Sequence, residues 1–423
     1  MFITYIEYEK EVIMKKVLIV SYYFPPLNTI AAKRYGTMCK YFRQNGYDAY
    51  VLTTTLKECQ FLSAKRDLEL PIPKEKIIRI GKGERYGKAE TERILLLEAI
   101  LKKYKLDFRT ISIEDLFWYK NVKRTCKLAE LKDIDIVIGT YGPIGNVYIA
   151  KYIAKKLGCP CILDIRDLIS EWQEAPEGYK RCMKIDNILE KMLLSSTDGI
   201  VTVTEGFKAI LKKKYPKVKV AAVFNGWDGK ASVCSRNVQQ KYLFYAGSLY
   251  EHRLESYALL LKALKKVNEK ETVKLVIRSI GPKTLDNKAK RIAVEMGVDD
   301  IVEILPSVAE DALKCEQGKA YINVILNSIH EENRDQMTTI PGKTYELLHE
   351  SAPVLAVTSK KSDLAQIVSY TKKGIASISE EEIEGFVLHD NIEYTGNNNV
   401  AKFSREYQAE RLCRFIDKTL KKK

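Results

Sequence analysis

The chain repeats one pattern twice: a short continuous apolar run, followed by a longer stretch with apolar residues at helical spacing. Four to six apolar residues in a row are typical of a strand buried on both faces of a parallel sheet. Successive strand, helix and strand segments form right-handed crossover units, so each round predicts a doubly wound α/β domain. In the first round we expect strands at Val17–Val20, Tyr50–Thr53, Ile134–Ile138, Cys161–Ile165, Ile200–Val203 and Val218–Phe224. In the second round we expect them at Tyr242–Tyr245, Val273–Ile277, Ile301–Ile304, Tyr321–Ile325 and Val354–Val357.

The two rounds are separated by a segment without periodicity. Turn residues at Asn225–Gly229 begin it, and a polar stretch continues to Gln240. A chain of 423 residues is long enough for two domains of roughly 200 residues each. We therefore expect one domain over residues 14–230 and a second over 235–395. Apolar residues at helical spacing within 400–423 predict a terminal amphipathic helix, which could join either domain.

Composition narrows the class of protein. With 46% hydrophobic and 30% charged residues the chain is expected to fold, and no apolar run reaches membrane-spanning length. Without the pattern of a secretory signal we expect a cytoplasmic protein. Nine scattered cysteines predict reduced thiols rather than a disulfide framework, and four isolated histidines indicate no transition-metal site. The formal charge of +15 requires an anionic partner but does not identify it.

The first strand-to-helix turn, Ser21–Asn28, contains no glycine. A dinucleotide-binding fold places G-x-G-x-x-G here, because glycine lets the backbone approach a pyrophosphate. This turn argues against a dehydrogenase. It still lies at the carboxyl end of a strand, where open α/β sheets bind ligands.

Two further segments concentrate charged residues at strand or helix ends. Asp164, Arg166 and Asp167 follow a buried strand within four positions, which favours a site, although an internal Asp–Arg pair closing the turn is the alternative. Pro341-Gly342 opens a helix whose first turn could bind phosphate. There the alternative is an ordinary amphipathic helix.

Taken together, these segments resemble the GT-B glycosyltransferases, and are most similar to retaining members of glycosyltransferase family 4 that build bacterial surface polysaccharides. The resemblance covers nearly the whole chain and rests on the order of Val17–Pro26, Asp164–Leu168, Phe224–Asp228, Tyr245–Tyr250 and Pro341–Glu346. It implies two Rossmann-like domains that face a cleft, with the C-terminal helix returning to the N-terminal domain. The first domain would take the acceptor and the second the nucleotide-sugar.

The resemblance also implies site residues. Those expected to bind the donor are Gly247, Ser248, Arg253, Gly342, Lys343 and Glu346, and those expected to act in catalysis are Asn28, Arg166 and Asp167. Glu346 would bind the donor ribose, while Lys343 and Arg253 would hold the diphosphate. Arg166 stands where many members carry a histidine. Asn28 belongs to the turn beside the transferred sugar.

Three departures from the family pattern leave open the alternative that the chain is an inactive relative of these enzymes. Thr338 replaces the first glutamate of the paired-glutamate motif, Ser351 replaces a glycine after it, and the first loop lacks glycine. The expected function is transfer of a sugar from a UDP- or GDP-sugar, used as substrate, to a lipid-linked or polysaccharide acceptor, with retention and without metal or cofactor. A nucleotide-sugar epimerase of the same fold and a non-catalytic nucleotide-sugar-binding scaffold remain alternatives.

Two other patterns bear on partners. Asp133-Ile134-Asp135 mimics a metal-binding D-x-D signature but begins a buried strand, so we expect no metal there. No aromatic-basic motif indicates nucleic acid. The apolar segment Ile94–Leu101, flanked by lysines, predicts reversible attachment to an anionic membrane surface on the inner face of the cell membrane, unless it packs on the sheet. The basic helix around Lys208 and Lys212–Lys214 would assist.

Overall fold

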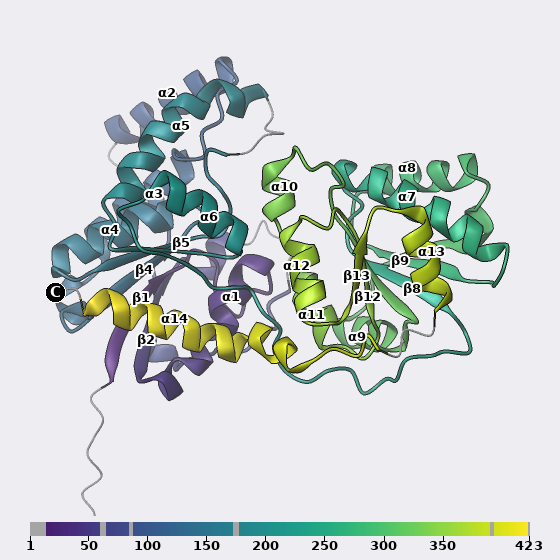
Figure 1. Ribbon diagram of the computed structural model, residues 1–423. Coiled ribbons are helices and arrows are strands. Elements are labelled where there is room, and N and C mark those ends of the chain that lie inside the picture. The colour runs from purple at the N-terminus through teal and green to yellow at the C-terminus, as the bar shows by residue number, and fades with distance from the viewer. Residues whose placement is uncertain (1–13, 60–64, 84–87, 172–176, 390–392, 422–423) are drawn as a thin grey trace, which may run out of the picture.

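The computed structural model describes residues 14–59, 65–83, 88–171, 177–389 and 393–421, apart from the side chains of residues 88–91, 94 and 95. Two parallel sheets lie side by side, each with helices on both faces (Figure 1). The first sheet contains β1 (Lys15–Val20), β2 (Tyr47–Thr53), β3 (Ile77–Arg79), β4 (Ile136–Thr140), β5 (Cys161–Ile165), β6 (Gly199–Thr202) and β7 (Val220–Ala222). The second contains β8 (Tyr242–Ala246), β9 (Lys274–Ser279), β10 (Val302–Pro306), β11 (Ile322–Leu326), β12 (Val354–Val357) and β13 (Gly374–Ser377).

Both sheets have the doubly wound strand order. The first runs β3-β2-β1-β4-β5-β6-β7 and the second β10-β9-β8-β11-β12-β13. In each sheet the order reverses beside the first strand, between β1 and β4 and between β8 and β11. Ligands of open α/β sheets bind outside the carboxyl ends of the strands at this reversal. The two doubly wound units predicted from the alternating pattern are confirmed.

Helices cover the sheets in layers. They are α1 (Ile30–Met38), α2 (Lys88–Lys103), α3 (Ile113–Thr125), α4 (Gly145–Leu157), α5 (Glu177–Ser195), α6 (Glu205–Lys214), α7 (Glu251–Asn268), α8 (Lys283–Glu295), α9 (Glu310–Lys319), α10 (Arg334–Thr338), α11 (Lys343–His349), α12 (Asp363–Tyr370), α13 (Glu380–Leu388) and α14 (Arg405–Leu420). Successive side chains of β1 point to opposite faces. Leu18 and Val20 pack with α3, α4 and α6, whereas Val17 and Ile19 pack with α1 and α14.

The C-terminal helix α14 returns to the first sheet (Figure 1). Its apolar residues Leu412 and Ile416 are fully buried against the sheet face that holds Val17 and Ile19. Ser404 caps the helix by accepting a hydrogen bond from the Tyr407 backbone N–H at 3.2 Å. The predicted return of the terminal helix to the N-terminal half is therefore confirmed. We use N-terminal half for the first sheet with its helices, including α14, and C-terminal half for the second sheet with its helices.

The sequence pattern missed two strands and misjudged one helix. The edge strands β3 and β13 have three and four residues and lack a long apolar run, so periodicity did not reveal them. The helix expected from Ile30 to Gln44 ends at Met38 and continues as two short 3₁₀ turns. Gly46, at φ 78°, ends the second turn in the left-handed conformation that glycine adopts without strain.

The expectation that the cysteines remain reduced is wrong for one pair. Cys234 and Cys315 form a disulfide with Cα atoms 5.3 Å apart. Cys234 lies in the segment between the two sheets and Cys315 on α9, 81 residues later. Spacing gives no sign of this pair, because only the folded second sheet brings α9 against the linker.

A buried ion pair fixes the carboxyl ends of the first sheet. Arg34 of α1 donates to both carboxylate oxygens of Asp164, at 2.8 and 2.9 Å, and both side chains are almost fully buried. The same guanidinium donates to Val223 O and to Asn225 Oδ1, each at 3.1 Å. Arg34 thereby joins α1, the end of β5 and the start of the linker. Asp164 pairs with Arg34 rather than closing the turn with Arg166.

We predict that Asp164→Ala destabilises the protein by about 3–5 kcal/mol, because it leaves the Arg34 charge buried without a partner. Urea denaturation followed by circular dichroism measures this. Glu130→Ala is the control: it removes an exposed ion pair to Lys127, so its effect should stay under about 1 kcal/mol. Equal losses in the two variants would contradict a structural role for the buried pair.

Candidate functional site

The predicted site residues emerge from the carboxyl ends of both sheets. Asn28 follows β1, while Arg166 and Asp167 follow β5. Gly247, Ser248 and Arg253 follow β8, and Gly342, Lys343 and Glu346 lie at α11, between β11 and β12. β1 and β8 border the strand-order reversals of their sheets. The fold therefore places both groups where doubly wound sheets bind ligands.

Two cations converge on Tyr245 at the end of β8. The Lys343 ammonium lies 3.4 Å from the ring centroid of Tyr245 and donates to Ala246 O at 2.9 Å. The Arg253 guanidinium donates to Ser248 O at 3.3 Å and lies 3.4 Å from the Tyr245 hydroxyl. Tyr245 is fully buried and donates its own hydroxyl to Ser248 O at 2.8 Å. No sequence motif indicated that Tyr245 joins the two cations.

These cations have no acidic partner. Within the part of the chain that the structure describes, neither Lys343 nor Arg253 forms an ion pair with a carboxylate. The Arg253 Nε is buried and makes no hydrogen bond there. Burial lowers the pKa of the Lys343 ammonium well below its usual range, and the nearby Arg253 guanidinium lowers it further. Arg253 with an unused donor, beside a lysine that an anion would return to its charged form, is suited to bind an anion such as a diphosphate.

The backbone beside the cations requires glycine. Gly247 has φ 142°, which disfavours any other residue, and a β-carbon there would lie 3.4 Å from Lys343 Nζ. Its N–H donates to Arg278 O at 3.0 Å and so continues the pairing with β9. Ser248 is 7% exposed and contributes its carbonyl to the Tyr245 and Arg253 contacts.

Glu346 lies on α11, one turn after Lys343, and is partly exposed. Gly342 precedes the helix and is exposed. Burial lowers the pKa of Arg405, at the start of α14, and the nearby carboxylates of Glu346 and Asp228 oppose that shift. Arg405 is therefore a further cation near Glu346. Sequence reasoning missed it, because no motif links the last helix to α11.

On the opposite sheet, two loops hold the residues predicted to act on the sugar. Asn28 precedes Thr29, the N-cap of α1, and its side-chain amide donates to Asp67 at 2.9 Å. Arg166 donates to Tyr141 O at 2.9 and 3.0 Å and to Gly142 O at 3.2 Å. Backbone carbonyls of the loop after β4 therefore hold the Arg166 guanidinium. Because a carbonyl oxygen carries no full negative charge, these contacts do not neutralise the positive charge of Arg166.

Thr338, which replaces the family glutamate, lies at a contact between the two halves. A β-carbon at Gly206 would come within 2.3 Å of Thr338 Cγ2, so α6 and α10 approach as closely as glycine allows. The Gly206 N–H also donates to the Asp363 carboxylate at 2.7 Å. The Thr338 methyl group fills the space beside Gly206. A longer glutamate side chain at this position would have to point away from α6.

The residues of the D-x-D pattern are engaged elsewhere. Asp135 accepts from the Lys16 backbone N–H at 2.7 Å, and Asp133 pairs with the Lys16 ammonium at 3.5 Å. β4 begins at Ile136, two residues later than the strand start we expected. Among the described residues no group of three or more His, Cys, Asp or Glu side chains is arranged to hold a metal.

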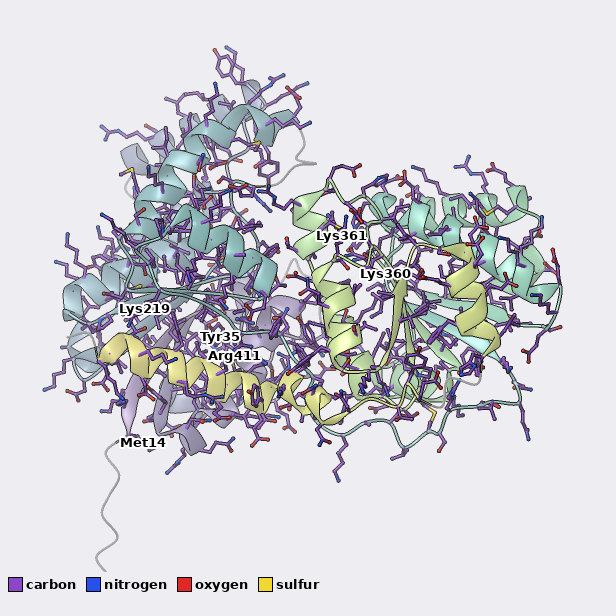
Figure 2. The ribbon with its side chains drawn as sticks, viewed as in Figure 1. Met14, Tyr35, Lys219, Lys360, Lys361 and Arg411 are labelled. Atoms are coloured by element: carbon purple, nitrogen blue, oxygen red, sulfur yellow. A yellow bond between two sulfur atoms is a disulfide. The ribbon has the colours of Figure 1, made fainter. Side chains whose placement is uncertain are left out.

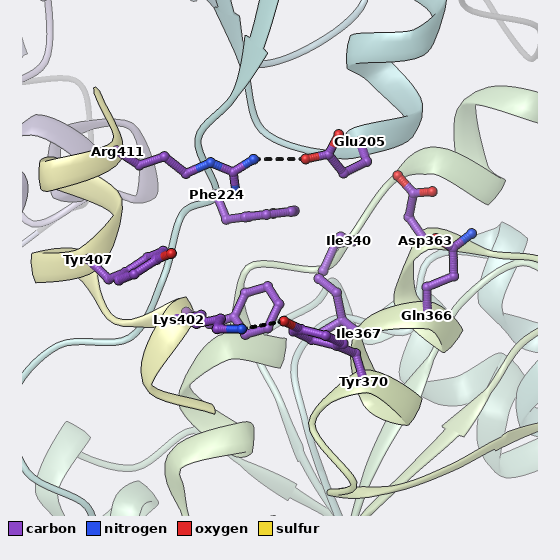
Figure 3. Close-up of a pocket in the computed structure, with 11 residues that line it drawn as sticks. Glu205, Phe224, Ile340, Asp363, Gln366, Ile367, Tyr370, Lys402, Tyr407 and Arg411 are labelled. Carbon is purple, nitrogen blue, oxygen red and sulfur yellow. Dashed lines mark hydrogen bonds and ion pairs between the residues drawn. The ribbon is translucent and has the colours of Figure 1, made fainter. Parts of the chain in front are cut away.

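An open cavity of about 470 Å³ is lined by other residues (Figure 3). Its lining residues come from α6, α12, α14 and neighbouring segments: Glu205, Phe224, Ile340, Asp363, Gln366, Ile367, Tyr370, Lys402, Phe403, Tyr407 and Arg411. None of the nine predicted site residues lines it. The candidate site is thus defined by its cations and its place in the fold rather than by this hollow.

Solved structures with the same arrangement exist, although their sequences differ widely. Sucrose-phosphate synthase from Thermosynechococcus elongatus is 12% identical, with a TM-score of 0.61 over 97% of this chain and 100% of that one. TarM of S. aureus, in a complex containing UDP, is 11% identical with a TM-score of 0.61 over 96% and 100%. A putative UDP-N-acetylglucosamine 2-epimerase from Listeria monocytogenes is 10% identical with a TM-score of 0.51 over 97% and 98%.

At these identities the similarity shows the fold, which is GT-B: two Rossmann-like halves with a terminal helix that returns to the first. No protein-family model matches the chain, and a search of curated proteins found no match. The neighbours include both glycosyltransferases and epimerases. The assignment to glycosyltransferase family 4 therefore stays a prediction.

We predict that UDP or GDP binding is accompanied by proton uptake at Lys343. The free ammonium has a lowered pKa, and a bound diphosphate raises it again, so affinity should fall as pH rises through the pKa of the free group. Calorimetry in buffers of different ionisation enthalpy measures the uptake. Lys343→Met should abolish it and weaken binding by about 1.5–3 kcal/mol. Unchanged uptake in this variant would exclude Lys343 from the anion site.

Proposed function

We propose that this GT-B chain is a glycosyltransferase that moves a sugar from a nucleotide-diphosphate sugar to a lipid-linked or polysaccharide acceptor. The observation that carries the proposal is the pair of cations at the end of β8, Lys343 and Arg253, which lack carboxylate partners among the described residues. Gly247, Ser248 and Gly342 would allow the diphosphate to approach the backbone there. Glu346 would accept hydrogen bonds from the ribose hydroxyls.

The proposed chemistry depends on the charge of the leaving group. Cleavage of the bond to the sugar leaves negative charge on the nucleoside diphosphate, and Lys343 and Arg253 are positioned to stabilise it. The transferred sugar would face Asn28, Arg166 and Asp167 from the other sheet. Because two cations already oppose the diphosphate, the reaction is proposed to need neither metal nor cofactor. Retention at the anomeric carbon rests on the family resemblance alone.

An epimerase is the second candidate, since a putative UDP-N-acetylglucosamine 2-epimerase has a similar fold. An epimerase changes the configuration of the sugar without an acceptor, whereas a glycosyltransferase releases nucleoside diphosphate as the acceptor gains the sugar. A non-catalytic scaffold, the third reading, would bind the nucleotide-sugar and leave it intact. Product identity separates the three.

We predict that Glu346→Gln weakens UDP or GDP binding by about 1.5–3 kcal/mol but leaves inorganic pyrophosphate binding unchanged, because the carboxylate contacts only the ribose. Titration calorimetry with both ligands decides this. Glu295→Gln, an exposed carboxylate at the end of α8, is the matched control and should change neither affinity. Equal weakening of pyrophosphate binding would contradict the ribose assignment.

We also propose that one surface of the N-terminal half, formed by α2 and α5, attaches to a membrane. On α2, Leu96 is 62% and Ile100 41% exposed, so the described part of this helix does not bury its apolar residues on the sheet. Ile94 and Leu95 lie outside the described side chains. A second apolar surface, which the sequence pattern did not reveal, lies on α5, where Ile188 and Met192 are 61% and 67% exposed.

α2 and α5 lie together at the outer end of the N-terminal half (Figure 1). The Asp107 N–H, just after α2, donates to Gly178 O at the start of α5 at 3.4 Å. We propose that their apolar residues enter the headgroup region of an anionic membrane, with Arg93, Lys102, Lys103 and Lys105 against the headgroups. No helix in the described residues is long and apolar enough to cross a bilayer.

The apolar residues of the basic helix α6 face the core rather than a membrane. Phe207 and Leu211 are buried in the core of the N-terminal half, and Lys214 pairs with Glu190 at 3.1 Å. Lys212 and Lys213 remain exposed. α6 can therefore attract an anionic surface but cannot insert into it.

We predict that vesicles containing phosphatidylglycerol carry the protein in flotation and that neutral vesicles do not. Replacing Lys102, Lys103 and Lys105 by glutamate should abolish flotation, since each lysine contributes about 1 kcal/mol near an anionic surface. The same replacement of Lys262, Lys283 and Lys290, on α7 and α8, is the control. Binding that ignores lipid charge would remove the proposal.

A further inference from the structure

A basic groove of about 700 Å³ follows the edge of the first sheet, between α6, β7 and α14. We call it the edge groove. Seven cationic side chains line it: Lys208, Lys212, Lys217, Lys219, Arg411, Arg414 and Lys418. No aspartate or glutamate is among its lining residues. Figure 2 labels Arg411 on α14 and Lys219, whose ammonium donates to Lys418 O of that helix.

Carboxylates elsewhere neutralise only part of this charge. Lys208 and Arg411 share Glu205, at 2.7 and 2.9 Å, and Arg414 reaches Glu410 at 3.5 Å. In the described part of the chain the four other lysines of the edge groove have no carboxylate partner. Like charges that gather in a concave surface raise the local concentration of anions.

The cations form two rows. Arg411, Arg414 and Lys418 stand at i, i+3 and i+7 on α14 and span about 10 Å at 1.5 Å per residue. Lys208 and Lys212 form the opposing row on α6, about 6 Å apart along that axis. The edge strand β7 lies between the rows. This spacing suits an extended chain with repeated negative charges.

We propose that the edge groove binds an anionic stretch of a glycan, as the acceptor or product polymer of the transfer reaction. The role in transfer rests on the proposed function, whereas the binding does not. The substrate class is a polysaccharide with carboxylate or phosphate groups. The groove would hold the polymer outside the reacting cleft and raise the effective concentration of its end.

Its shape and lining favour a glycan over the other polyanions. A membrane surface is flat and cannot follow a groove between two helices. Single-stranded nucleic acid needs exposed aromatic rings on which bases stack. The aromatic residues of the edge groove are engaged, because Phe415 is buried at 8% exposure and the Tyr407 ring carries the Arg414 guanidinium at 5.7 Å.

The edge groove also continues toward the boundary between the two halves. Tyr407 and Arg411 line both the groove and the open cavity of about 470 Å³ (Figure 3). Phe224 and Tyr370 form aromatic walls of that cavity, and Asp363 from α12 supplies a carboxylate. Cations lie over both rings, Arg411 at 5.4 Å from the Phe224 centroid and Lys402 at 5.2 Å from that of Tyr370, so the polar groups of the cavity are what suit it to sugar hydroxyls. A glycan in the groove thus has a path of compatible chemistry beyond it.

Fluorescence anisotropy with a labelled oligogalacturonate tests the proposal. The wild type should bind it, and Lys212→Glu, Lys217→Glu and Lys418→Glu together should weaken binding at least about tenfold, as expected for three lost exposed charge contacts. Lys262→Glu, Lys283→Glu and Lys290→Glu together carry the same charge change on α7 and α8 and should retain affinity. Uncharged maltooligosaccharide should not bind.

The glycan-binding proposal and the transferase proposal can fail independently. UDP and GDP binding is therefore measured by calorimetry in the same proteins. Loss of oligogalacturonate binding in the groove variant, with nucleotide binding retained, supports the proposal. Equal affinity of wild type and groove variant, or no binding by either, overturns it. Equal or tighter binding of oligothymidylate of matched charge overturns it in favour of nucleic acid. Loss of flotation on phosphatidylglycerol vesicles in the groove variant, with oligogalacturonate affinity equal to that of the wild type, overturns it in favour of a membrane.

Discussion

The buried pair between Arg34 and Asp164 is the constraint on which the N-terminal half depends. An isolated charge in such a site would be strongly destabilising, so the two groups specify each other's position. Because Arg34 also holds the carbonyl of Val223, the pair fixes α1, β5 and the exit toward the second sheet in one arrangement. Asn28 lies just before α1 and Arg166 two residues beyond Asp164. The structural ion pair therefore positions the two loops that carry Asn28 and Arg166.

The C-terminal half differs, because its central basic side chains have no carboxylate partner among the described residues. There Lys343 and Arg253 are brought together around Tyr245 with no carboxylate among the described residues to compensate them. Like charges held close in a partly buried site cost free energy, which a bound diphosphate would return. The two halves meet where Gly206 contacts Thr338 and Asp363, and neither Lys343 nor Arg253 takes part in that contact. The proposal therefore assigns the donor to the second half and the acceptor to the first.

The sequence predicted the parts of the fold that local patterns specify. Continuous apolar runs located eleven of the strands, and the periodicity at the end of the chain revealed α14. The short edges β3 and β13 and the disulfide between Cys234 and Cys315 depend on neighbours distant in sequence, so no local pattern marks them. For the site, the family resemblance implied that Lys343 and Arg253 bind the donor, whereas the contacts of Tyr245 and Arg405 became visible only through packing. The roles assigned to all nine residues stay predictions.

The most direct test of the central claim is product analysis with a panel of UDP- and GDP-sugars, in the presence of a chelator and with or without a polyprenyl-linked or polysaccharide acceptor. Mass spectrometry and nuclear magnetic resonance identify the products. The account predicts that nucleoside diphosphate is released as the acceptor gains one sugar, and that the chelator has no effect. A change in sugar configuration without an acceptor, or a nucleotide-sugar that binds and remains intact under every condition, would contradict it.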